Sequence, residues 1–211
     1  MDVASLTIDE FLDRLASSDP TPGGGSLAAL AGAMAAAMLT MVCTFTIGRP
    51  RYADVESDVQ DILRATQQLR QRLIGLANGD VSAYGAVRAA YGLPRSTDHE
   101  RTARATAIEA SMHDATTVPV ETAEAARQVV DLALQAGRIT NTQLLSDVAV
   151  GAHLALGALR GAADQASLNL ASLKDADFVA RMRARIGTAT EGADAAVAQT
   201  LEAVASRSAG S

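Results

Sequence analysis

Two prolines and three glycines precede a long uncharged stretch in the segment "DPTPGGGSLAALAGAMAAAMLTMVCTFTIG". Gly23, Gly24 and Gly25 carry no Cβ, so a ligand can touch bare backbone where the chain turns into a helix. Free N–H groups and the helix dipole at such a start favour an anion or a carbonyl oxygen. The loop lacks the lysine of a P-loop, and no predicted strand precedes it as in dinucleotide-binding folds. Two interpretations stay open, a ligand-binding loop or a glycine turn that permits close helix packing.

Two aspartates are candidates for acid–base chemistry. Asp147 lies in a nearly uncharged segment, where a carboxylate is costly unless a partner or a function keeps it there. Asp80 directly follows Asn78 and Gly79, so it is either a catalytic carboxylate or the N-cap of a helix that continues through Ala83.

The histidines and the cysteine do not indicate a metal centre. His153 lies on an apolar helix and fits a hydrogen-bonded core histidine better than a base. His99 and His113 stand in charged or polar surroundings, which predicts surface positions. Cys43 is the one cysteine, so no internal disulfide can form and a reducing cytoplasm is expected. Scattered histidines with one thiol predict that no metal is bound.

Composition and periodicity predict the elements that must position these groups. Aromatic residues make up 3% of the 211 residues, there is no Trp, and Ala is abundant, which favours closely packed helices over sheets. Apolar residues recur at three- and four-residue intervals almost everywhere, and no strand pattern is found. The sequence predicts an all-α bundle of about five to seven helices with long, Ala-rich central helices. We expect one domain over residues 1–207 and a disordered tail over 208–211.

Three features refine the helix pattern. A long helix over 53–92 is expected, with a bend near Asn78 and Gly79. Thr97 and Glu100 have the spacing of a capping box and predict the start of the next helix. Pro119 is expected to kink or interrupt that helix.

Two segments, within 21–48 and 141–170, have almost no charged residues. The first is long enough to span a membrane, but Ala, Gly and Thr give it little drive into lipid. The chain begins with the acidic stretch "MDVASLTIDEFLDRL", which predicts a short amphipathic helix rather than a signal peptide. We therefore expect both segments to be helices buried on all sides, with a second subunit covering part of them in a homodimer.

The charge balance limits the partners. The net charge is −6 and the isoelectric point is near 5.0, whereas nucleic acids and anionic membranes select basic surfaces. Small molecules and other subunits are the expected partners.

Four stretches resemble one family in order along nearly the whole chain. "TIDEFLDRLASSDPTPGGGSLAALAGAMAAAMLTMV" is similar to the start of the formiminotransferase-cyclodeaminase/methenyltetrahydrofolate cyclohydrolase family, which has a P-T-P-G-G-G-S loop before an Ala-rich helix. Further family motifs resemble "TIGRPRY", "DVSAYGAVRAAYGLPRST" and "LLSDVAVGAHLALGALRGAADQASLNLASLKD". The resemblance implies a homodimeric, all-helical enzyme that needs no cofactor and acts on the one-carbon unit of a tetrahydrofolate.

The implied reaction gives the candidate residues their roles. In 5,10-methenyltetrahydrofolate, water must add to a cationic carbon between two nitrogens, and a carboxylate would stabilise the cation and take a proton. Asp80 and Asp147 are the catalytic candidates. The remaining candidates are expected to bind substrate, including its anionic tail: Pro22, Gly23, Gly24, Gly25, Ser26, Arg49, Arg51, Arg95, Asn141, Ser146 and Asn169. Structural roles stay open for three of these, helix caps for Ser26 and Asn141 and a packing amide for Asn169.

The chain departs from the family pattern at several positions. Thr140 stands where members have Gly, Gln165-Ala166 where they commonly have Asn-Val, and arginines at 49, 51 and 95 where they have lysines. Arginine keeps the charge but cannot replace a lysine whose proton is used. The expected activity is hydrolysis of 5,10-methenyltetrahydrofolate to 10-formyltetrahydrofolate; the alternatives are a formimidoyltetrahydrofolate cyclodeaminase that releases ammonia and a non-catalytic folate binder.

Overall fold

The computed structural model describes residues 2–209, and no strand occurs in that range. The prediction of an all-α fold is confirmed. A short 3₁₀ turn at Val3–Ser5 precedes the first α-helix, and two more, at Pro50–Val55 and Thr142–Leu144, lie between helices. The α-helices are α1 (Ile8–Leu15), α2 (Gly24–Thr44), α3 (Glu56–Tyr91), α4 (Asp98–Ile139), α5 (Leu145–Leu170), α6 (Ala176–Thr190) and α7 (Ala193–Ala209).

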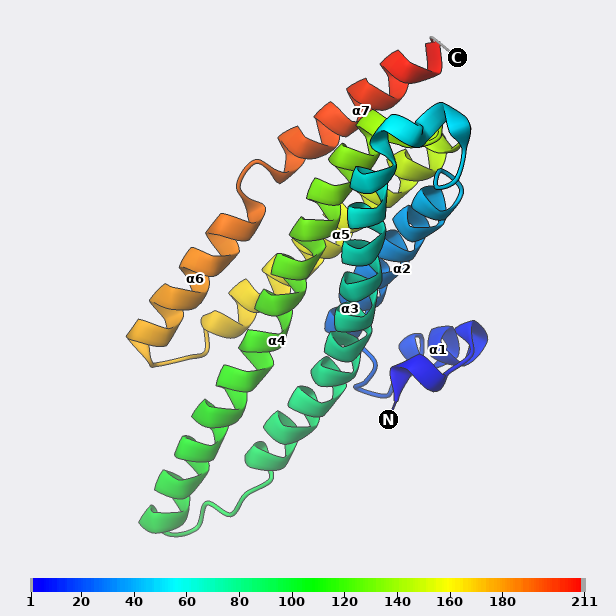
Figure 1. Ribbon diagram of the computed structural model, residues 1–211. Helices are drawn as coiled ribbons and strands as arrows, with labels where there is room; N and C mark the ends of the chain where they lie inside the picture. Colours follow the sequence, from blue (N-terminus) through cyan, green and yellow to red (C-terminus); the bar gives the residue numbers. More distant parts are fainter. Residues whose placement is uncertain (1, 210–211) are drawn as a thin grey trace.

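Helices α2 to α5 form the central bundle (Figure 1). The two longest helices, α3 and α4, run side by side, and their hairpin extends beyond the other helices. Helices α6 and α7 pack along α4 and α5. Helix α1 lies at the edge of the bundle, where Phe11 and Leu12 line a pocket together with Leu27, Leu30 and Met34 of α2. The centre is rich in buried alanines such as Ala29, Ala36, Ala133 and Ala155, whose small side chains let the helix backbones approach closely.

Two capping boxes set helix starts, and the one at Thr97 and Glu100 is the box that the sequence predicts. The Thr97 hydroxyl accepts the N–H of Glu100, whose carboxylate accepts the N–H of Thr97, and α4 begins at the next residue. Thr7 and Glu10 form the same box at α1, the amphipathic helix expected near the start of the chain.

Helix α3 continues without a break through Asn78, Gly79 and Asp80. The interpretation of Asp80 as the N-cap of its own helix is therefore wrong. Asn78 does not form a turn; its Oδ1 accepts the N–H of Val3 at 2.7 Å and ties the N-terminal segment to α3. Packing of α3 between α2 and α4 outweighs the roughly 1 kcal/mol that a glycine costs inside a helix.

Helix α4 also continues through Pro119, so the expected interruption does not occur. Proline has no N–H, which leaves the carbonyl of Ala115, four residues earlier, without its helical donor. The side-chain amide of Asn169 on α5 donates to that carbonyl at 2.8 Å. A side chain of the neighbouring α5 thus supplies the donor that the proline lacks. This one hydrogen bond accounts for the role of Asn169 and for the continuity of α4 through Pro119.

The two nearly uncharged helices are not buried on all sides in one chain, which corrects that expectation. Leu27 (44% exposed), Met34 (53%) and Phe45 (52%) lie at the surface of α2 or at its end, and Val150 (53%) and Leu168 (74%) at that of α5. By length and composition alone, Gly24–Thr44 and Thr142–Leu170 are also apolar enough to cross a membrane. Helices α2 and α5 both pack against other helices of the bundle, and half of the most apolar 18-residue stretch of α2 is buried.

The histidine expectations are corrected in two cases. His153 is exposed, so it is not a core histidine. His113 is half-buried rather than on the surface, and its ring stacks on Phe178 with 4.0 Å between the ring centres. His99 is exposed as expected. At the C-terminus α7 continues to Ala209, and the rest of the expected tail lies outside the described residues.

Candidate active site

Asp80 and the glycine loop meet at the start of α2. The Asp80 Oδ2 atom accepts hydrogen bonds from the N–H and the hydroxyl of Ser26, at 2.8 Å and 2.7 Å. Ser26 is the third residue of α2, whose N-cap, Gly23, has no side chain to offer. Asp80 therefore takes the place of an N-cap side chain from a different helix, and the positive end of the α2 dipole stabilises its carboxylate.

The next two glycines of the loop make room for polar side chains. A Cβ built on Gly25 would lie 2.0 Å from the Asp80 Oδ1 atom. A Cβ built on Gly24 would lie 2.7 Å from the Gln165 Nε2 atom on α5. The close packing is therefore against a carboxylate and an amide, so the packing interpretation and the ligand-site interpretation of this loop are compatible.

The first turn of α2 also has unused donors. No residue in the described range accepts a hydrogen bond from the N–H of Gly24 or of Gly25. Gly24 is exposed, while Pro22, Gly25 and Ser26 are buried. We call this region, formed by residues 22–26, Asp80 and Gln165, the glycine end. Its carboxylate and its backbone donors without acceptors lie at the same first turn of α2, an arrangement suited to a polar ligand.

A second set of candidate residues lies near the other end of α2. A cavity of about 290 Å³ is lined there by Arg49, Pro50, Arg51, Tyr52, Asn141, Thr142 and Gln143. We call this region, together with Thr46, Ser146 and Asp147, the arginine end.

Buried neutral groups hold the arginine end together. The Asn141 N–H donates to the Thr46 hydroxyl at 3.0 Å, and the Tyr52 hydroxyl donates to the Asn141 side chain at 3.4 Å. The Asn141 Oδ1 atom also accepts the N–H of Gln143, so Asn141 caps the 3₁₀ turn, the structural role considered for it. The N–H of Thr142 donates to the Tyr52 oxygen at 3.0 Å. These bonds join the segment after α2 to the segment before α5.

The arginines of this end are exposed. The Arg49 Nε atom donates to the Phe45 carbonyl at 2.6 Å, and the Arg51 guanidinium lies 5.9 Å from the centre of the Tyr52 ring. Burial acts to raise the pKa of Tyr52, but the bond from Thr142 and nearby positive charges outweigh it and lower that pKa. The side chains of Arg49 and Arg51 therefore form a positive surface suited to an anion.

Asp147 and Ser146 lie in the first turn of α5. Asp147 is half-buried and has no hydrogen bond or ion pair within residues 2–209. The dipole of α5 favours a negative charge at this position. Ser146 is exposed.

The candidate residues therefore do not form one site within a single chain. The 21 residues of α2 separate the two ends by about 30 Å, at 1.5 Å per residue. Arg95 is in a third place, exposed in the turn between α3 and α4. Asn169 lies one turn beyond Gln165 on α5, and its amide donates to Ala115.

Sequence reasoning missed two residues of these regions as site residues. Tyr52 was part of the quoted stretch "TIGRPRY", and its position there was the available signal. Gln165 was noticed as a departure from the family pattern, but its approach to Gly24 depends on how α5 crosses α2. No signal along the chain could have revealed that crossing.

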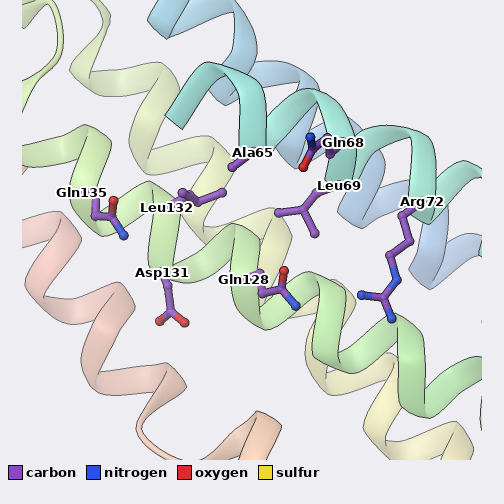
Figure 2. A pocket seen from close by; sticks show the side chains of 8 residues that line it. All are labelled: Ala65, Gln68, Leu69, Arg72, Gln128, Asp131, Leu132 and Gln135. Atoms are coloured by element: carbon purple, nitrogen blue, oxygen red, sulfur yellow. The ribbon is translucent and has the colours of Figure 1, made fainter. Parts of the chain in front are cut away.

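A larger groove lies elsewhere, between α3 and α4 (Figure 2). Its volume is about 400 Å³, and Leu69 and Leu132 lie among exposed polar side chains such as Gln128 and Arg72. None of the candidate residues lines this groove, so it is not part of either end.

Metal-ligand clusters and a reactive thiol are not found among the described residues. No group of three or more His, Cys, Asp or Glu side chains in that range could hold a metal ion. Cys43 is fully buried, and burial raises the pKa of its thiol to about 12. The thiol is therefore protonated at neutral pH and unreactive.

The fold and the glycine end define an all-α protein with a carboxylate held over an open helix start, and comparison with known proteins identifies its family. A formiminotransferase-cyclodeaminase profile matches residues 7–188. The chain is 44% identical over 172 residues to the methenyltetrahydrofolate cyclohydrolase of Methylorubrum extorquens, covering 82% of this chain and 83% of that protein. This chain belongs to the formiminotransferase-cyclodeaminase family.

Two further relatives extend the comparison. The formimidoyltransferase-cyclodeaminase of Rattus norvegicus is 28% identical over 93% of this chain, which spans only 36% of that longer protein. The crystal structure of formiminotetrahydrofolate cyclodeaminase from Thermotoga maritima superposes with a TM-score of 0.87, at 25% identity, over 97% of this chain and 98% of that one. The named relatives are thus enzymes that act on folate derivatives.

Proposed function

We propose that this protein is a methenyltetrahydrofolate cyclohydrolase with Asp80 as its catalytic base. The observation that carries the proposal is the Asp80 carboxylate, held by Ser26 at the open first turn of α2. The relative with 44% identity supports the choice of substrate, because it matches most of both chains.

The geometry suits the addition of water to a cation. The bridging carbon of the methenyl group carries positive charge, which the Asp80 carboxylate would stabilise. Asp80 takes one proton from water as the water oxygen bonds to that carbon. The carbon–N5 bond then breaks, the hydroxyl proton passes to N5, and the oxygen becomes the formyl carbonyl on N10. One proton is released overall, and the step needs no cofactor.

The cyclodeaminase reaction is the second candidate. The relative with a TM-score of 0.87 is named a formiminotetrahydrofolate cyclodeaminase and matches almost the whole chain. In that reaction N10 adds to the formimino carbon, and ammonia leaves after it gains a proton. The same carboxylate would take the N10 proton as N10 adds and pass it to the leaving nitrogen. The position of Asp80 therefore fits both reactions, and only the substrate distinguishes them.

Absorbance with each substrate tests the proposal. The near-ultraviolet absorbance of 5,10-methenyltetrahydrofolate is lost on hydrolysis and appears on cyclodeamination. We expect the protein to accelerate the loss far above the buffer rate and to leave the formimino substrate unchanged. Turnover of the formimino substrate alone would replace the proposal with the cyclodeaminase. A protein inert toward both would leave a non-catalytic folate binder.

We also propose that the protein works as a homodimer. Exposed or half-buried apolar residues recur along one side of α2 and just past its end, as in a helix–helix seam: Leu27, Leu30, Met34, Met38, Met41 and Phe45. The seam runs from the glycine end to the arginine end, and its first part also borders Phe11 and Leu12 of the chain's own N-terminal segment. Rows of exposed apolar residues are typical of subunit contacts. Burial of well over about 2,000 Å² in total is expected for an obligate dimer.

An antiparallel arrangement of two copies would explain why the candidate residues separate into two ends. A two-fold axis across the middle of the α2 seam brings the arginine end of one copy to the glycine end of the other. The Asp80 carboxylate and the exposed Arg51 would then serve one composite site, with Arg51 binding the anionic tail of the substrate.

Mixed dimers test the composite site. Asp80→Asn and Arg51→Ala each damage one partner of every site in their own homodimers. A heterodimer of the two variants contains one undamaged site, so mixing after denaturation and refolding should raise kcat/KM above that of either variant. No gain on mixing, with hybrid dimers verified by mass, would show that both residues act within one chain. A folded monomer at micromolar concentration would contradict the dimer itself.

The charge and the cysteine content of the chain also support proposals for its partners and its cellular location. A small folate and a second copy are the proposed partners, with no nucleic acid and no membrane, because the chain is acidic. A cytoplasmic location is proposed because Cys43 is the one cysteine and needs no oxidising compartment.

A further inference from the structure

The amide of Gln165 lies beside the first turn of α2 and has no partner. It is half-buried, and a Cβ on Gly24 would be 2.7 Å from its Nε2 atom. No residue in the described range forms a hydrogen bond with this amide. An amide in this position contributes little to folding, because a polar group that leaves water without a partner loses free energy.

Gln165 and Asp80 each approach a glycine in the first turn of α2. Gly24 gives room to Gln165 and Gly25 gives room to Asp80, from α5 and α3 respectively. Neighbouring Cα atoms are about 3.8 Å apart, so the amide and the carboxylate border the same small region. An alanine at either glycine would displace the polar group that faces it.

A second side-chain amide on α5, that of Asn169, has a structural role and provides a comparison. Asn169, one turn further on, donates to the carbonyl that Pro119 leaves free. Gln165 has no comparable partner, although it is one turn closer to Asp80 and the open N–H groups of Gly24 and Gly25.

We propose that Gln165 binds the reacting group of the substrate. Its NH₂ donates a hydrogen bond to the oxygen that water delivers to the bridging carbon, on the opposite side from the Asp80 carboxylate that accepts the proton. The bond orients the attacking oxygen and follows it as it becomes the formyl carbonyl. This role rests on the proposed cyclohydrolase function and adds a second side chain, from α5, to the same site.

Gln165→Met tests the role, because methionine has nearly the same length and no hydrogen-bonding amide. We expect kcat to fall at least about tenfold, with KM within about threefold, because the lost bond acts on the attacking oxygen. Melting temperature and molecular mass in solution should match those of wild type. Gln128→Met, at an exposed glutamine of the α3–α4 groove, is the matched control and should leave all four values unchanged.

Gly24→Ala gives an independent check. Its methyl group would push the Gln165 amide aside, so kcat should fall in this variant too. The double variant should be no slower than Gln165→Met alone, because both changes remove one interaction. Additive losses would mean that the two residues act separately, which contradicts the proposal.

Two results would overturn the inference. One is a Gln165→Met variant with the kcat of wild type. The other is a Gln165→Met variant whose molecular mass in solution shows dissociated subunits, because the amide would then be a subunit contact. Wild type is assayed in the same preparation. If wild type is active and Gln165→Met equals it, this inference alone fails, whereas an inert wild type removes the proposed function and this role with it.

Discussion

The two ends of α2 use their polar residues in opposite ways. At the arginine end, Tyr52, Asn141 and Thr46 bond to one another and to backbone groups, so the network is closed. At the glycine end, Asp80 is held by Ser26 alone, and the amide of Gln165 and two backbone N–H groups stay open.

This difference in hydrogen bonding indicates which polar groups stabilise the fold and which are available for chemistry. A closed network of neutral groups stabilises the fold, because each buried donor has an acceptor. Open donors beside a fixed carboxylate stabilise nothing in the free protein and are available to a ligand. We propose that the exposed arginines at the other end serve binding rather than chemistry.

The largest effect is expected for Asp80→Asn at the glycine end. The amide can still accept the N–H of Ser26, but it cannot take a proton, so kcat should fall by at least about 10²-fold. The loss of stability should stay near 1 kcal/mol, since only the charge of a cap is removed. Kinetics and thermal melting of one preparation measure both. Asp58→Asn, at an exposed aspartate of the same helix, is the control; equal kcat in the two variants would exclude Asp80 as the base.

The next effect concerns stability on α5, one turn beyond the glycine end. Asn169→Ala leaves the Ala115 carbonyl without a donor and should lower the free energy of unfolding by about 1–3 kcal/mol. In a Pro119→Ala background, residue 119 regains an N–H for that carbonyl, so the same substitution should cost less. Urea unfolding of the four proteins of this cycle measures the coupling. An equal cost in both backgrounds would mean that Asn169 does not compensate for the proline.

At the arginine end, Arg51→Ala should raise KM about tenfold and leave kcat within about threefold. Loss of one charge-assisted bond to an anionic tail weakens binding by this order without touching the reacting carbon. The KM of a substrate that lacks the glutamate tail should not change. A fall in kcat with unchanged KM would assign Arg51 to chemistry and remove the contrast between the two ends.

The smallest effect is expected for Asp147→Asn. This carboxylate has no partner in the described range and mainly benefits from the α5 dipole, worth about 0.3–1 kcal/mol. We expect kcat to fall no more than about tenfold, measured under the conditions used for Asp80→Asn. A 10²-fold loss would instead place Asp147 in the reacting part of a composite site.

Local features were predicted well from the sequence because their causes lie within a few residues. The capping box at Thr97 and Glu100 needs only its own turn, and α4 starts where that box places it. The expected interruption at Pro119 failed because the compensating donor, Asn169, is on another helix. The sequence offered Asp80 as a candidate carboxylate, but its role as a cap for α2 depends on a contact across 54 positions in the chain.

By itself, the sequence determined the helical class, the family and the residue types available for chemistry. Period, composition and short motifs are properties of the chain alone. Only the tertiary structure decided which candidates meet: it paired Gly25 with Asp80 and Gly24 with Gln165, and it left the arginines at the other end of α2, about 30 Å away. Such pairings depend on how helices cross, and a crossing is set by the packing of many side chains, to which no single motif corresponds.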